Sequence, residues 1–208
     1  SDRYIRHDAV SNFILKQARN LYGGRVTKED IFYYVYGFLH SPEYRKAFSA
    51  DLKKMLPRIP LVEKPADFWS FCKAGRDLAD LHLNYETIEP ARQVVVNYCA
   101  YEEISYRVEK MRFVSKGDKT AIQYNRGIVI ENIPLEAYDY VVNGKSAIEW
   151  LMERYQLKTD TASGITNDPN DWGAEHNNEK YIFNLLLRII NLSVQTVEIV
   201  KALPKLNF

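Results

Sequence analysis

Two predicted turns near the middle of the chain carry polar side chains of types that can read nucleic-acid bases. The run Lys116-Gly117-Asp118-Lys119 has the Gly-Asp chemistry of a turn between two strands, and Asn125-Arg126-Gly127 predicts a second turn. Lys and Arg side chains hydrogen-bond guanine, whereas Asn and Gln hydrogen-bond adenine. We call the candidate side chains on these turns and the strand between them the hairpin set: Lys116, Lys119, Gln123, Asn125 and Arg126.

No motif in the sequence predicts catalysis. Gly144-Lys145-Ser146 has the last letters of a phosphate-binding loop, but the glycine needed five positions earlier is replaced by Asp139. A helix stop at Asn143-Gly144 and a new helix cap at Ser146 explain these residues better. The run Asn167-Asp168-Pro169-Asn170-Asp171-Trp172 is similar to the target-amine loop of amino-methyltransferases, but Asn170 stands where that loop needs its second proline. We therefore predict no catalytic residue.

The cysteines and histidines do not have the spacing of metal ligands. Cys72 and Cys99 are far apart, and none of the four histidines has a second histidine at ligand spacing. We expect two buried thiols, no metal and no cofactor.

The first part of the chain, about residues 1–90, has helical periodicity. Thr27 is a predicted helix cap before an apolar face that extends to Leu39. Ser41-Pro42 predicts the start of a second helix that runs to Met55 or Leu56, and Pro65 the start of a third that runs to about Leu83.

The middle of the chain, about residues 91–134, has strand-like patterns at residues 94–96, 107–114, 120–124 and 128–131. Helical patterns return in residues 135–208, with segments at 138–142, 146–155 and 178–202, and a long loop at 158–179. The predicted fold class is α+β, with a helical first part, a small antiparallel β-sheet in the middle and a long C-terminal helix.

The chain has a net charge of +1 and therefore lacks the excess of basic residues that is typical of proteins that bind nucleic acids. The charge is unevenly distributed, because residues 1–60 hold 11 basic and 6 acidic side chains, whereas residues 131–180 hold 4 and 10. A near-zero total can therefore hide a basic face. Charged residues interrupt every apolar run before it approaches 18 residues, so we predict no membrane span.

Three long blocks go beyond these general patterns. They are Tyr33 to Arg45 followed by Leu56 to Leu61, then Phe68 to Leu78, and Ser163 to Trp172. Together they resemble the C-terminal specificity domain of the single-polypeptide, helicase-containing Type ISP restriction-modification enzymes. The resemblance covers about residues 30–172. The start at Ser1-Asp2-Arg3 also looks like a cut inside a longer polypeptide.

The resemblance implies that residues 1–208 are one target recognition domain. Its partners would be double-stranded DNA and the methyltransferase domain of the same polypeptide, in the cytoplasm. The domain itself would be non-catalytic and would direct adenine methylation and cleavage by neighbouring domains.

If the chain binds DNA as the resemblance implies, the hairpin set fits base reading best, because its side chains include both amides and cations. A second set of cations on the predicted helices fits phosphate contacts: Arg45, Lys54, Lys73 and Arg76. The long loop adds side chains that can contact DNA or cap the backbone of the loop itself: Ser163, Thr166 and Asn167.

Two alternatives belong to other classes of function. A helical docking module would pack its aromatic first half and its long last helix on a neighbouring domain and read no bases. A free-standing enzyme would need a pocket with converging titratable groups, which the sequence does not predict.

Overall fold

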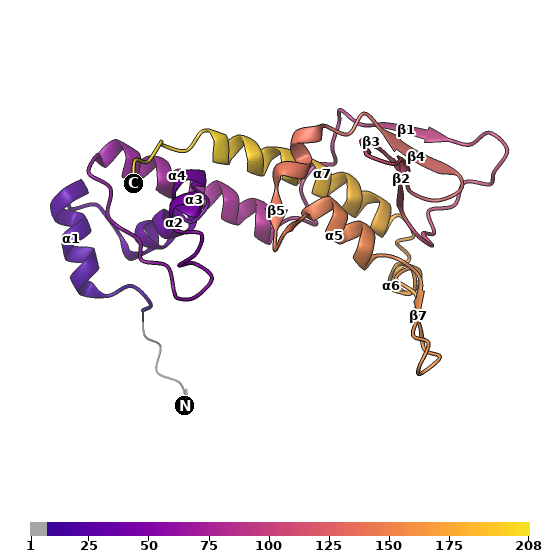
Figure 1. Ribbon diagram of the computed structural model, residues 1–208, viewed down its shortest axis with the longest axis horizontal. Coiled ribbons are helices and arrows are strands. Elements are labelled where there is room, and N and C mark those ends of the chain that lie inside the picture. The colour runs from indigo at the N-terminus through magenta and orange to yellow at the C-terminus, as the bar shows by residue number, and fades with distance from the viewer. Residues whose placement is uncertain (1–7) are drawn as a thin grey trace. The chain divides into compact units, whose positions relative to one another are not determined.

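The computed structural model describes residues 8–208, so Ser1-Asp2-Arg3 lies outside the described residues. The chain divides into two compact units (Figure 1). Unit 1 comprises Ser1–Leu83 with Glu198–Phe208, and unit 2 comprises Asn84–Val197. Each unit has a hydrophobic core of its own.

Each of the first three helices of unit 1 begins at a side chain that caps it. Helix α1 (Asn12–Tyr22) follows Ser11, α2 (Lys28–Phe38) follows Thr27 and α3 (Pro42–Ala47) follows Ser41. In all three, the capping hydroxyl accepts a hydrogen bond from the backbone N–H three residues later, which would otherwise lack a partner.

Helix α4 (Pro65–Leu83) packs against α2 with almost no space between the two backbones. A Cβ atom on Gly37 would lie 2.3 Å from the carbonyl oxygen of Phe71, and one on Gly75 would lie 1.9 Å from that of Tyr33. Glycine is therefore required on both helices. The buried rings of Tyr34, Phe38, Phe68 and Phe71 pack around this crossing.

Unit 2 is built around a four-stranded antiparallel sheet with the order β1-β4-β3-β2. The strands are β1 (Val95–Tyr98), β2 (Arg112–Ser115), β3 (Asp118–Gln123) and β4 (Ile128–Glu131). Ile122 on β3 lies opposite Ile130 on β4, and Arg112 on β2 lies opposite Gln123. This register places Ile122 and Ile130 in the core.

Short elements follow the sheet. They are the 3-10 helix η1 (Leu135–Asp139), the hairpin of β5 (Val141–Val142) and β6 (Lys145–Ser146), α5 (Ala147–Arg154), the hairpin of β7 (Lys158–Thr159) and β8 (Thr166–Asn167), and α6 (Asp171–Glu175). The last element is α7 (Tyr181–Lys201), of which Tyr181–Val197 belongs to unit 2.

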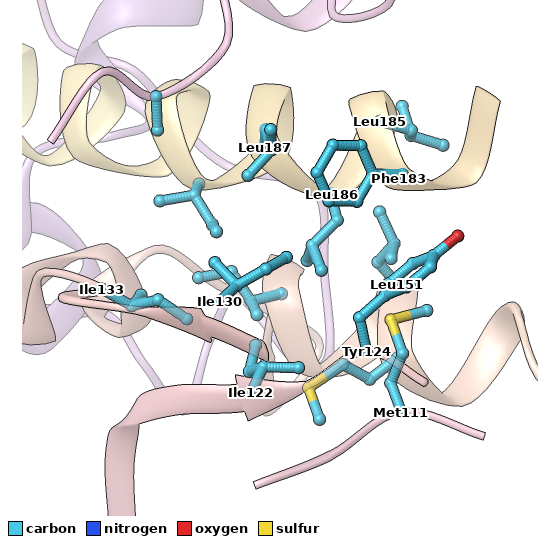
Figure 2. Packing of buried hydrophobic residues seen from close by; sticks show 14 of the residues in the cluster. Met111, Ile122, Tyr124, Ile130, Ile133, Leu151, Phe183, Leu185, Leu186 and Leu187 are labelled. Carbon is cyan, nitrogen blue, oxygen red and sulfur yellow. The ribbon is translucent and has the colours of Figure 1, made fainter. Parts of the chain in front are cut away.

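The core of unit 2 lies between the sheet and α7. Figure 2 shows Phe183 and Leu186 of α7 pointing toward Ile122 and Ile130 of the sheet. All four side chains are buried, and α5 adds Leu151 to the same cluster. The predicted α+β class, with a central antiparallel sheet and a long C-terminal helix, is confirmed.

Several predictions for individual segments were wrong. The helix after Pro42 ends at Ala47 instead of Leu56, because the hydroxyl of Tyr44 bonds the carbonyl of Arg58 and that of Tyr34 bonds the carbonyl of Pro60, which fixes the following chain in a non-helical path. Residues 138–142 form no single helix: Tyr138 and Asp139 end the 3-10 helix η1, and Val141-Val142 is the strand β5.

A turn, a loop and a thiol also differ from the predictions. Asn143-Gly144 turns the β5–β6 hairpin, with both residues at positive φ, instead of ending a helix. The long loop contains the β7–β8 hairpin and α6. Cys72 is buried as predicted, whereas Cys99 is exposed. Helix α1 was not predicted.

Helix α7 is long and apolar enough, by length and composition, to cross a membrane, with a mean hydropathy of 1.4 over its most apolar 18 residues. Arg188 interrupts the apolar residues of this helix, so no uninterrupted apolar run marks it in the sequence. In the structure 61% of this window is buried inside the protein, as in a helix that forms part of a protein core.

Candidate nucleic-acid interface

A groove of about 520 Å³ lies in unit 2, where the end of β3 meets the segment before β2. The turn between β3 and β4 and the loop after β1 complete its lining. Its lining residues are Glu102, Glu103, Ser105, Arg107, Glu109, Lys110, Arg112, Gln123, Asn125, Arg126 and Gly127.

Three cations of the groove are free of protein partners. Lys110, Arg112 and Arg126 are exposed, and within residues 8–208 none of them makes an ion pair or a side-chain hydrogen bond. The fourth cation, Arg107, is held by an ion pair with Asp168. The groove therefore offers three side chains whose donors are available to a ligand.

Carboxylates share the groove with these cations. Glu102, Glu103 and Glu109 lie along it, and Glu102 reaches the β3–β4 turn, because a Cβ atom on Gly127 would lie 3.6 Å from the Cβ of Glu102. A surface that binds only phosphates is mainly basic, whereas base edges present both donors and acceptors. The mixed lining is therefore chemically suited to base edges.

The hairpin set divides between the two ends of β3. Gln123, Asn125 and Arg126 line the groove. Lys119 lies at the start of the strand and Lys116 in the turn before it, and at the usual rise of a β-strand the start of β3 is about 17 Å from its end. The structure thus brings three of the five predicted residues together and separates the other two from them.

Lys119 and Asn125 already have partners inside the protein. The Nζ of Lys119 lies 2.9 Å from Glu149 Oε1 and 5.1 Å from the ring centre of Tyr138. The Nδ2 of Asn125 donates to the carbonyls of Ser105 and Arg107, and its Oδ1 accepts from the N–H of Gly127. Both side chains are therefore used in building the fold.

Gln123 and Lys116 are less constrained. Gln123 Nε2 donates to the carbonyl of Asn125, and within the described residues its Oε1 accepts no hydrogen bond. Lys116 lies in the exposed turn between β2 and β3.

The predicted phosphate contacts all lie in unit 1. Arg45 on α3 and Lys54 after it are exposed. Lys73 pairs with Asp77 one turn along α4. Arg76 pairs with Asp30 at 2.7 Å, and its guanidinium lies 4.7 Å from the ring centre of Tyr33.

The pairing of Arg76 is part of the network that starts α2. Burial favours the neutral form of Asp30, but hydrogen bonds from Thr27 and the guanidinium of Arg76 outweigh it and hold the pKa of Asp30 below its ordinary value. Arg76 therefore joins α4 to the capping box of α2.

Of the three candidate side chains predicted in the long loop, Ser163, Thr166 and Asn167, two bond within the β7–β8 hairpin. Ser163 bonds Asp160 through its N–H and its hydroxyl, and the hydroxyls of Thr166 and Thr159 lie 2.9 Å apart. Asn167 is exposed on β8. This hairpin, marked by β7 in Figure 1, extends away from α5 and α6.

The sequence did not single out Arg107, Lys110 or Arg112, although it predicted strand-like alternation in this stretch. Their positions flank the buried Val108 and Met111, which is the pattern that marks them as the exposed face. Nor did it single out the role of Asn170, whose side chain bonds the backbone of Val108.

Within residues 8–208, no three His, Cys, Asp or Glu side chains form a group that could hold a metal ion.

A family model described as the Type ISP C-terminal specificity domain matches residues 1–185. The chain is similar to the ATP-dependent Type ISP restriction-modification enzyme LlaBIII bound to DNA, with 42% identity and a TM-score of 0.84 over 97% of this chain and 12% of that one. It is also similar to a nuclease-deletion mutant of the Type ISP enzyme LlaGI in complex with a DNA substrate mimic, with 48% identity and a TM-score of 0.78 over 86% of this chain and 14% of that one.

A third similar structure is the DrdV–DNA complex, with 26% identity and a TM-score of 0.80 over 100% of this chain and 21% of that one. The chain thus spans between 12% and 21% of the length of these three proteins. No curated protein matches it.

Proposed function

Because the chain belongs to the family of Type ISP C-terminal specificity domains, we propose that it recognises double-stranded DNA by sequence and that the groove of unit 2 reads the bases. The observation that carries this proposal is the combination of three unpaired cations with three carboxylates in one groove of about 520 Å³. All three similar structures are complexes with DNA or a DNA mimic, which supports DNA as the ligand.

The roles of the groove residues follow from their free atoms. Arg112 and Arg126 can each form the paired hydrogen bonds that arginine makes with guanine, and Gln123 Oε1 can accept from an adenine or cytosine amine. The carboxylates of Glu102 and Glu103 repel phosphates and accept from amino groups on bases. Lys119 and Asn125 are weaker candidates for base contact, because partners in the protein occupy their polar atoms.

The remaining predicted residues would hold the DNA backbone. Lys116, Arg45 and Lys54 are exposed, and within the described residues they form no ion pair. Lys73 and Arg76 are poorer phosphate ligands, because each already pairs with a carboxylate. The β7–β8 hairpin would form a further contact with DNA through Ser163, Thr166 and Asn167.

Catalysis belongs to other domains in this proposal. The domain directs adenine methylation and cleavage by neighbouring domains of one cytoplasmic polypeptide, and its direct protein partner is the methyltransferase domain. No membrane contact is part of this function, since the apolar helix α7 is mostly buried.

A docking function for unit 1 is favoured by a separate observation. Large apolar side chains are exposed on it, and Leu56 is 88% exposed. A contiguous patch of such side chains is typical of surfaces that pack on another domain. The exposed apolar residues of this unit include Phe13, Leu21, Phe32, Met55 and Leu56. If docking were the only function, substitutions in the groove would leave the DNA target unchanged.

The experiment is a genome-wide map of adenine methylation by the full-length protein, repeated for Arg126→Ala. We expect the methylated sequence to become degenerate at one base pair, because one good base contact supplies about 1–3 kcal/mol of discrimination. Arg154→Ala is the matched control, since Arg154 is exposed on α5 outside the groove. An identical methylated sequence for wild type, Arg126→Ala and Arg112→Ala would refute base reading by the groove.

A further inference from the structure

One wall of the groove is a segment without a strand partner, along which exposed and more buried residues alternate. We call Ser105–Glu109 the wall segment; it lies outside the strands, yet each of its five carbonyl oxygens accepts a hydrogen bond from elsewhere in unit 2. Asn125 bonds the carbonyls of Ser105 and Arg107, the Tyr124 hydroxyl bonds that of Tyr106, Asn170 bonds that of Val108, and the N–H of Leu157 bonds that of Glu109.

Two asparagine amides supply three of these five bonds. Asn170 acts much as a neighbouring strand does: its Oδ1 accepts from the N–H of Val108 at 2.9 Å, and its Nδ2 donates to the carbonyl of the same residue at 2.8 Å. Asn125, on the β3–β4 turn, donates at 2.7 and 2.9 Å to carbonyls two residues apart. Side chains therefore replace the missing strand along this wall.

The same network fixes one of the cations of the groove. Asn170 donates its second N–H to Asp168, and the other oxygen of Asp168 accepts from Arg107. Burial opposes ionisation of Asp168, but the hydrogen bonds from Asn170 and Arg107 lower its pKa below the ordinary value. The carboxylate is therefore charged at neutral pH and holds the guanidinium at the wall.

The position of the wall segment decides which side chains face the groove. Ser105, Arg107 and Glu109 line the groove, whereas Val108 is fully buried between them. Because exposed and more buried residues alternate along this segment, a slip of one residue would exchange the two sets. Bonds that fix the carbonyls of this segment therefore also fix the lining of the groove.

We propose that Asn125 and Asn170 are positioning residues, which hold the wall segment in register and thereby shape the groove for its DNA target without contacting the bases. This inference rests on the proposed function of the groove. It assigns a role to the Asn167-Asp168-Pro169-Asn170 run that is unrelated to methyl transfer, and it gives Asn125 a task other than base reading.

The hydrogen-bond inventory of Asn125 favours this role. An asparagine that reads adenine needs both its Oδ1 and an N–H of its Nδ2. In this structure the Oδ1 accepts from Gly127, and Nδ2 already donates to two carbonyls. A base contact would therefore break bonds that hold the wall.

The first test measures the wall without DNA, by hydrogen exchange of the full-length protein. Asn125→Asp and Asn170→Asp keep the shape of the side chain but remove the N–H donors. We expect amide exchange in peptides covering residues 105–110 to be at least about tenfold faster in both variants. A carboxylate cannot donate to the carbonyls of this segment, so the segment opens and exposes the N–H of Val108, which is hydrogen-bonded in the intact wall. Asn143→Asp, in the β5–β6 turn, is the matched control and should leave this exchange unchanged.

Unchanged exchange in both variants would overturn the proposal. If either variant fails to fold, Tyr124→Phe gives the same test, because it removes the donor to the carbonyl of Tyr106 and keeps the buried ring.

The second test maps adenine methylation by the same full-length variants. A positioning role predicts an unchanged methylated sequence, a methylation rate at least about tenfold lower, and a double variant within about threefold of the slower single variant, because both residues act through one segment. A change of the methylated sequence at one base pair in Asn125→Asp would identify a base reader and overturn the proposal. A wild-type methylation rate in both variants would overturn it as well.

Arg126→Ala separates this proposal from the function on which it rests. If Arg126→Ala and Arg112→Ala leave the methylated sequence unchanged, the groove does not read DNA, and the proposed function fails even when exchange in the wall segment responds. If Arg126→Ala changes the methylated sequence while exchange in the wall segment does not respond to Asn125→Asp or Asn170→Asp, only the positioning role fails.

Discussion

Lys73 and Arg76 lie on the same helix and have the same charge, but their partners differ. Lys73 pairs with Asp77 on the exposed side of α4. Arg76 bonds Asp30, whose side chain is only 12% exposed and which also caps α2. An exposed ion pair contributes little to stability, whereas a partly buried one that supports a cap contributes more.

We therefore predict that Arg76→Ala lowers the free energy of unfolding by about 1–2 kcal/mol, and Lys73→Ala by less than about 0.5 kcal/mol. Chemical denaturation of the two variants measures both values. Equal losses would contradict the structural role of Arg76, and a large loss of DNA affinity in Arg76→Ala without a loss of stability would restore it as a phosphate contact.

Single residues also mark the limit of prediction from sequence. Asn125 and Arg126 are adjacent and were predicted as equivalent, but the structure gives Asn125 three backbone partners and leaves Arg126 with none among the described residues. Residue type shows which bonds a side chain can make. Which bonds Asn125 makes depends on the carbonyl of Ser105, which lies 20 residues earlier in the chain. The sequence around Asn125 has no pattern that indicates this contact.

At the scale of elements, the crossing of α2 and α4 brings two helix backbones into direct contact. A Cβ atom on Gly75 would lie 1.9 Å from the carbonyl oxygen of Tyr33. This oxygen belongs to the backbone of α2 and cannot move unless the helix moves with it. The two helices must therefore separate or rotate to accept any other residue.

We predict that Gly75→Ala lowers the free energy of unfolding by about 3 kcal/mol or more, at the upper end of the overpacking range, even though alanine favours helices. Gly24→Ala is the control, because nothing lies within 4 Å of a Cβ atom there. Thermal or chemical unfolding measures both. A Gly75→Ala variant as stable as the control would show that the helices do not approach as described.

The sequence predicted the elements that depend on local signals. Helix α4 begins at Pro65 and ends at Leu83 as predicted, and β4 occupies the predicted residues 128–131. Elements that depend on distant contacts were not predicted. The two-residue strands β5 to β8 have too few residues for a periodic pattern, and the helix after Pro42 stops early because tertiary hydrogen bonds from Tyr34 and Tyr44 compete with its periodicity.

At the scale of the whole molecule, the net charge of +1 fits a domain that adds specificity more than affinity. The groove has the same balance, since its four cations share it with three carboxylates. If the groove binds DNA as proposed, counterion release by such a surface is small, and most of the binding energy must come from matched hydrogen bonds to bases. In the proposed function, neighbouring domains would supply the general attraction to DNA.

The most direct test of base reading by the groove is the ratio of two affinities of the full-length protein, measured at one fixed salt concentration. The first is the affinity for a duplex with the sequence that the protein methylates, and the second is the affinity for a scrambled duplex. We predict that Arg126→Ala lowers this ratio by about tenfold or more and leaves the affinity for the scrambled duplex within about threefold of wild type. An unchanged ratio, with both affinities reduced equally, would show that Arg126 contacts only phosphates and would contradict base reading by the groove.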